Sequence, residues 1–132
     1  LYGYRPDIYS TRVHDDLTAT AFYFKQGTVE AVMVSLCVCL LQTALSNKIS
    51  ALIEEKTGIP ADNCILSATH THTGPNVSGT FGWGDIDEKY CSEIFIPAVL
   101  PSANLASISF QFAYNVIPPY NIFCVSKSFP KI

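Results

Sequence analysis

Hydrophobic positions in the first third of the chain predict two strands joined by a tight turn. Residues 17–25 alternate loosely and are rich in threonine and aromatic side chains, which favours a strand. Gln26-Gly27 is typical of a tight turn, and residues 28–38 form a second strand. This second strand is apolar on both faces, as expected where a sheet is covered on both sides. The pair predicts a β-hairpin.

An amphipathic helix and a third strand are predicted next. Gly58 stands where a helix C-terminus favours a left-handed residue, and Pro60 keeps the helix from continuing. Residues 64–69 then form a short apolar strand. Strand, helix and strand in this order predict a βαβ unit with parallel strands and a right-handed crossover. The apolar helix positions recur every three or four residues: Leu41, Leu45, Ile49, Leu52 and Ile53.

A glycine-rich loop is predicted to follow the third strand and to lead into a second helix. The loop runs from Thr73 to Gly84. Asp85 is expected to cap a helix starting at Ile86, with Glu88 completing a capping box.

Prolines limit the regular structure expected in the C-terminal third. Pro97 and Pro101 are expected to end the second helix early. The chain becomes aromatic and strand-like from Ser107, until Pro118-Pro119 breaks the pattern. Residues 107–132 are therefore left unplaced in the fold.

Composition agrees with one domain that buries a core. The chain has 132 residues, 48% of them hydrophobic and only 14% charged, which excludes a disordered segment. We predict a single α/β domain over residues 1–132, with a mixed sheet built from the hairpin and the βαβ unit and helices packed on it in three layers. The net charge is −3 and the basic residues are scattered, so nucleic acid is not an expected partner. No signal peptide is visible, and the longest apolar run is too short for a transmembrane segment, which leaves the localisation undetermined.

Two histidines follow the third strand directly. Ligands of open α/β sheets bind beyond the carboxyl ends of the strands, and His70 and His72 lie at that place. Two residues apart on extended chain, their side chains should point to the same side. They fit a metal ligand with a neighbouring acid/base, or two metal ligands, and zinc is the metal that a hydrolytic imidazole site favours. The alternative is a pair of exposed loop histidines, since no acidic residue is placed by spacing to complete the site.

Other chemically interesting side chains have simpler interpretations. His14 is expected in a solvated loop, and it approaches the pair only if the hairpin packs beside the third strand. Cys37 and Cys39 are interpreted as buried free thiols rather than as ligands, because no second cysteine pair accompanies them. Trp83 either shields a substrate or fills a gap in the core. Tyr2 is assigned to a loop in preference to a pocket lining, together with Tyr4 and Arg5.

The strand and the two histidines resemble a known signature. Residues 65–75, ILSATHTHTGP, are similar to the motif of the neutral/alkaline non-lysosomal ceramidases and their bacterial relatives. The resemblance covers roughly residues 1–100. It implies the N-terminal part of a zinc amidohydrolase that cleaves the N-acyl bond of ceramide or a related lipid amide, completed by the remainder of a longer chain. Further matches occur in the family's order at Gly3-Tyr4, 13–17, 19–24, 32–36 and 57–63.

The resemblance also implies roles for individual residues. His70 would be a zinc ligand, and His72 would be catalytic, by stabilising the oxyanion or assisting proton transfer. His14 matches a position where relatives often have histidine and is a further candidate site residue. The family's other ligands, a His, a Glu and a Tyr, come from farther downstream than 132 residues reach, and Cys37 stands where many relatives carry Asp.

Two alternatives remain open at this point. One is a non-catalytic α/β domain that keeps the fold but has lost the active site. The other is a cysteine enzyme that uses Cys37 or Cys64 with a nearby histidine.

Overall fold

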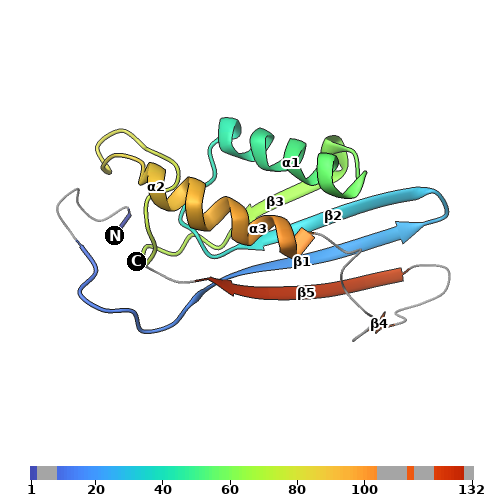
Figure 1. The fold of residues 1–132 in the computed structure, drawn as a ribbon, viewed down its shortest axis with the longest axis horizontal. Coiled ribbons are helices and arrows are strands. Elements are labelled where there is room, and N and C mark those ends of the chain that lie inside the picture. Colours follow the sequence, from blue (N-terminus) through green and yellow to red (C-terminus); the bar gives the residue numbers. More distant parts are fainter. Residues whose placement is uncertain (3–8, 104–112, 115–120, 130–132) are drawn as a thin grey trace.

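Five strands form one mixed sheet in the computed structural model, which describes residues 1–2, 9–103, 113–114 and 121–129. The order across the sheet is β3-β2-β1-β5-β4 (Figure 1). β2 and β3 are parallel, and the other neighbouring pairs are antiparallel. The predicted α/β class and the mixed sheet are therefore confirmed. The strands are β1 (Leu17–Gln26), β2 (Val29–Leu36), β3 (Cys64–Ala68), β4 (Ala113–Tyr114) and β5 (Asn121–Phe129).

The predicted hairpin consists of β1 and β2. Gln26 lies opposite Val29 in the register, so Gly27 and Thr28 make a two-residue turn. Gly27 has a φ of 59°, a left-handed conformation that glycine adopts without a steric penalty. The turn signal in the sequence thus fixes the register of the two strands.

The predicted βαβ unit is also present. Helix α1 (Thr43–Thr57) connects β2 to β3, which pair in parallel with Leu36 opposite Ala68. Gly58 ends the helix in the left-handed conformation expected of it, with a φ of 78°, and its N–H donates to the carbonyl of Glu54 at 2.8 Å. A short 3-10 turn, η1 (Ala61–Asn63), then leads into β3.

The second helix differs from the prediction at both ends. It consists of α2 (Glu88–Tyr90), the π turn η2 (Cys91–Phe95) and α3 (Ile96–Ala103). Asp87, not Asp85, is the N-cap, and its carboxylate accepts the N–H of Tyr90 at 2.9 Å. The reason is Asn76, whose side-chain amide donates to the carbonyls of Gly84 and Asp85, both at 2.9 Å. These bonds hold the residues before Asp87 outside the helix.

The expectation that proline ends this helix early is wrong. In the π turn, the N–H of Ile96 reaches the carbonyl of Cys91, five residues back. We attribute the tolerance of Pro97 to this wider turn, which gives room to a ring that would otherwise clash with the preceding turn. The helix therefore extends past Pro97 and Pro101 to Ala103.

Helices α1 and α3 cover the same face of the sheet and contact each other (Figure 1). The opposite face leaves Ile65 59% exposed and Phe24 37% exposed. The described residues thus form two layers, and the expected third layer is not among them. The reason is that α3 packs beside α1 on the face where β1 and β2 present their most buried side chains. That core contains Ala19, Ala21, Val32, Val34, Leu36, Ile49, Ile53, Tyr90, Phe95 and Val99.

Strand β5 was not predicted. All of β5 pairs with β1, from Leu17 opposite Phe129 to Lys25 opposite Asn121. β4 agrees with the strand-like character expected after Ser107, whereas residues 107–112 and the two prolines at 118–119 lie outside the described residues. Within the described part of the chain, no helix combines the length and apolar character needed to cross a bilayer.

Candidate metal centre

The candidate site lies just beyond the carboxyl ends of the two parallel strands. After β2 and β3 end, their chains stay side by side, because the N–H of Thr69 donates to the carbonyl of Leu36 at 2.9 Å. The N–H of His70 donates in the same way to the carbonyl of Val38 at 3.0 Å. The register of the sheet therefore brings the segment that contains Cys39 against the segment that contains the two histidines.

Three potential ligand side chains converge at this place. The Sγ of Cys39 is 3.7 Å from Nδ1 of His70 and 3.7 Å from Nε2 of His72. The two Nε2 atoms are 3.4 Å apart. One ligand atom from each of the three residues lies within 4.8 Å of the other two, so the group could hold a metal ion. Cys39 is buried, His72 is partly buried and His70 is exposed, which gives the site one side open to solvent.

Backbone carbonyls determine which ring nitrogens are available. Nδ1 of His70 lies 2.9 Å from the carbonyl oxygen of Cys39, and Nδ1 of His72 lies 3.1 Å from that of Tyr2. A carbonyl oxygen can only accept, so each Nδ1 must carry the hydrogen and donate it. Each neutral ring is then left with a lone pair on Nε2. This is the arrangement by which proteins orient metal-binding histidines.

With both Nδ1 atoms carrying the hydrogens, the two Nε2 atoms lie 3.4 Å apart with no hydrogen between them. Such a contact is repulsive unless a proton or a metal ion lies between the two nitrogens. Two histidine nitrogens bound to one tetrahedral zinc ion at 2.0–2.1 Å are about 3.3 Å apart. The observed separation is of the size that a shared metal ion would need.

His70 has a backbone conformation that the sequence did not predict. Its φ is 64°, and among the described residues it is the only non-glycine with a positive φ. β3 ends at Ala68, so the two histidines do not follow each other on extended chain as expected. Their rings still meet, with centroids 4.8 Å apart and planes at 87°, because the left-handed turn at His70 redirects the chain. A strained non-glycine residue of this kind is typical of functional sites.

Tyr2 and Trp83 form a wall beside His72. The Tyr2 side chain is only 1% exposed, its hydroxyl accepts the N–H of Thr80 at 3.1 Å, and its own N–H donates to Gly74 at 3.1 Å. The ring of Trp83 lies 5.5 Å from that of Tyr2 and 5.8 Å from that of His72. Tyr2 therefore lies in a turn, as expected, but its side chain is buried and packs against Trp83. Trp83 lies where it can shield a bound molecule, one of its two expected roles.

The remaining candidates lie elsewhere. His14 is not part of the cluster, because its side chain is 81% exposed and its Nδ1 contacts the neighbouring carboxylate of Asp15. It occupies the solvated position that was its default interpretation. Tyr4 and Arg5 lie outside the described residues.

Cys39 is the site residue that the sequence interpretation missed. It is a free and buried thiol as expected, but it also faces both imidazoles, whereas Cys37 contacts the hydroxyl of Thr18 at 3.1 Å. Burial raises the pKa of the Cys39 thiol, so without a metal ion it stays protonated at neutral pH. The sequence did contain a signal for this contact. Cys39 comes three residues after Leu36, the end of β2, and the histidines come shortly after Ala68, which lies opposite Leu36 in the parallel pair.

Comparison of the chain with protein-family models, curated proteins and solved structures finds no match. The chemistry of the site therefore has to be inferred from its own donor atoms. One thiol sulfur and two imidazole nitrogens are ligands that zinc prefers, and three protein ligands are the usual number in zinc sites that keep a position for water.

Proposed function

We propose that this chain carries the metal centre of a zinc-dependent amidohydrolase, as the N-terminal part of a ceramidase-like protein that hydrolyses a lipid amide. The observation that carries the metal centre is the pair of Nε2 atoms held 3.4 Å apart, next to the thiol of Cys39. The lipid-amide substrate class and the ceramidase relationship depend only on the sequence resemblance, of which residues 65–75 are the most specific part.

The residues present fit a zinc ion. Nε2 of His70, Nε2 of His72 and Sγ of Cys39 would hold it, with the carbonyls of Cys39 and Tyr2 keeping both rings in the correct tautomer. When bound, zinc supplies Lewis acidity at the amide carbonyl and lowers the pKa of water at its open position. In this proposal His72 is a ligand, in place of the proton-transfer or oxyanion role that the resemblance implies.

The other residues of the site shape the space around the metal. The ring of Trp83 lies beside His72 and is backed by the ring of Tyr2, which limits the access of water from that direction. The exposed side at His70 is left for the substrate. No carboxylate joins the cluster among the described residues, so a general base would have to come from the remainder of a longer chain. We therefore expect weak metal binding and little turnover from these 132 residues alone.

A non-catalytic metal-binding domain is the second candidate. The lack of a carboxylate in the described cluster favours it, since hydrolysis needs a group that accepts a proton. A cysteine enzyme is less well supported. The thiol beside the imidazoles is Cys39, and burial raises its pKa, which opposes the thiolate that such chemistry requires.

Calorimetric titration of the purified chain with zinc tests the metal centre. We expect one zinc ion per chain, no measurable binding by His70→Ala, and binding weakened at least about tenfold by His72→Ala. His14→Ala is the matched control, because it removes an exposed histidine outside the cluster, and it should bind like the wild type. Equal binding by all four proteins, or none by the wild type, would overturn the proposal.

Hydrolysis is a separate question from metal binding. A fluorescent ceramide analogue, incubated with a longer protein that contains this chain, should be cleaved in the presence of zinc and not after His70→Ala. Zinc binding without cleavage by that protein would leave the non-catalytic candidate.

A further inference from the structure

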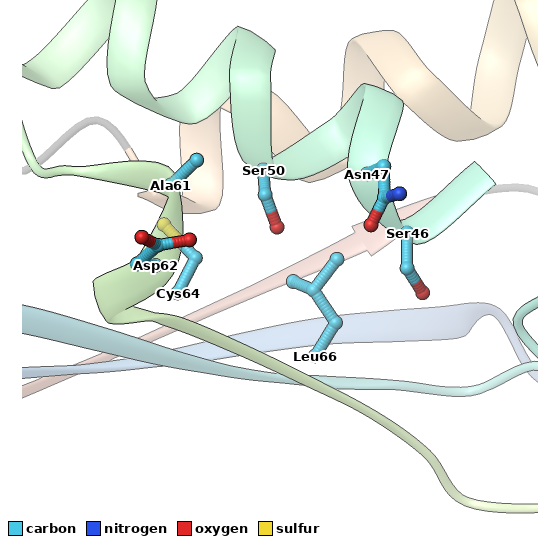
Figure 2. A pocket seen from close by; sticks show the side chains of 7 residues that line it. All are labelled: Ser46, Asn47, Ser50, Ala61, Asp62, Cys64 and Leu66. Atoms are coloured by element: carbon cyan, nitrogen blue, oxygen red, sulfur yellow. The ribbon is translucent and has the colours of Figure 1, made fainter. Parts of the chain in front are cut away.

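A cavity apart from the candidate metal centre lies between α1, η1 and the edge strand β3 (Figure 2). Its volume is about 500 Å³, within the range of small-molecule sites. It shares no lining residue with the metal centre. The lining consists of Ser46, Asn47, Ser50, Ala61, Asp62, Cys64 and Leu66.

The polar side chains of this cavity converge without engaging each other. Ser46, Asn47 and Ser50 project from one side of α1, opposite Asp62 (Figure 2). Within the described part of the chain, none of these four side chains has a hydrogen-bond partner. Their two hydroxyls, one amide and one carboxylate are therefore free to bind a ligand from several directions.

The charge of the cavity is negative. Asp62 is the one charged residue of the lining, and the lining contains no lysine or arginine. The Cys64 thiol adds no charge, because burial and the nearby carboxylate of Glu54 raise its pKa. Glu54 accepts the N–H of Ala61 at 3.2 Å, which places a second carboxylate at the rim. Phosphates and carboxylates are therefore disfavoured, and a cation is favoured.

We propose that this cavity binds a small ligand that carries one ammonium group and several hydroxyls, such as an amino sugar. The ammonium group pairs with Asp62, and the hydroxyls bond to Ser46, Asn47 and Ser50. Leu66 provides an apolar floor for the carbon skeleton (Figure 2). Together these groups would favour such a ligand over one that lacks the ammonium group or the hydroxyls.

The test uses glucosamine and glucose, which differ in the charged amino group. Titrations of ¹⁵N-labelled chain, followed by two-dimensional NMR, should show saturable shifts at the amides of residues 46–50 and 61–66. Glucosamine should bind about threefold to fivefold more tightly than glucose, as expected of an ion pair open to solvent. Asp62→Asn keeps the size of the side chain and should abolish that preference, while Ser50→Ala should weaken both sugars.

Glu55→Gln is the control for loss of a charge, since Glu55 lies on α1 but does not line the cavity. It should leave both affinities unchanged. The absence of saturable shifts, equal affinities for the two sugars, or the same preference in Asp62→Asn would each overturn the proposal. Neither Asp62 nor Ser50 has a partner to lose, so both variants should keep the wild-type spectrum without ligand.

Discussion

The two ends of the central strands accommodate a left-handed residue in opposite ways. At the hairpin end, Gly27 has a φ of 59°, and a Cβ added there would meet nothing within 4 Å. At the other end, His70 has a φ of 64° with its side chain bonded to the carbonyl of Cys39. At the hairpin end, glycine adopts the left-handed conformation without steric strain. At the other end, histidine adopts the same conformation in spite of the strain that its Cβ causes. The strained residue at the end of β3 is thus also one of the three that could hold a metal ion.

Zinc should stabilise the chain through the end that carries His70, and this is the largest effect we expect. A zinc concentration of 100 times Kd would raise the free energy of unfolding by about 2.7 kcal/mol, because the metal binds only the folded arrangement. Thermal unfolding with and without zinc measures this, and a chelator should reverse it. His70→Ala should unfold at the same temperature under both conditions. A stabilisation by zinc that survives in His70→Ala would place the metal elsewhere.

Replacing the thiol should weaken zinc binding without removing it. In Cys39→Ser the two histidines and their carbonyl partners remain, so we expect a loss of at least about tenfold in affinity. Cobalt gives a second readout, because a thiolate ligand adds a charge-transfer absorption that should vanish in Cys39→Ser. Cys37→Ser is the control, since that thiol contacts Thr18. An unchanged cobalt spectrum would remove Cys39 from the ligand set and leave the histidines.

Local patterns explain how much of the fold was predictable. The hairpin, α1 and β3 depend on neighbouring residues: Gly27 in a turn, Gly58 at a helix end, and apolar spacings along the chain. Asp87 displaced Asp85 as the cap because Asn76, distant in sequence, occupies the carbonyls before it. Local sequence patterns do not predict such contacts between residues that are distant in sequence.

Long-range pairing explains what was missed. The position of β5 in the sheet depends on β1, with which the whole of β5 pairs. The sequence of residues 107–132 alone does not specify that partner. Cys39 was missed for a related reason. It was interpreted from the lack of a second cysteine pair, although its neighbours at the site are set by the register between β2 and β3.

Substitutions at the two left-handed positions should change the free energy of unfolding in opposite directions. Gly27→Ala should destabilise the chain by about 1 kcal/mol, since alanine is strained at a positive φ and gains no contact. His70→Gly should be more stable than His70→Ala by about 1 kcal/mol, because glycine removes the same strain. Urea denaturation without metal measures both differences. Equal stabilities for His70→Gly and His70→Ala would mean that position 70 stores no strain.

The smallest effect should come from the ion pair next to the hairpin turn. Lys25 lies opposite Glu30 and bonds to it, but both side chains are substantially exposed. The bond to Lys25 lowers the pKa of Glu30, so its contribution to stability is present above the ordinary glutamate pKa and is lost as the pH falls below it. Because solvent screens the pair, Glu30→Gln should leave the urea midpoint at pH 7 within error of the wild type. A clear loss there, absent at pH 3, would show that the hairpin end also depends on a specific side-chain interaction, and the contrast with the candidate metal centre would no longer hold.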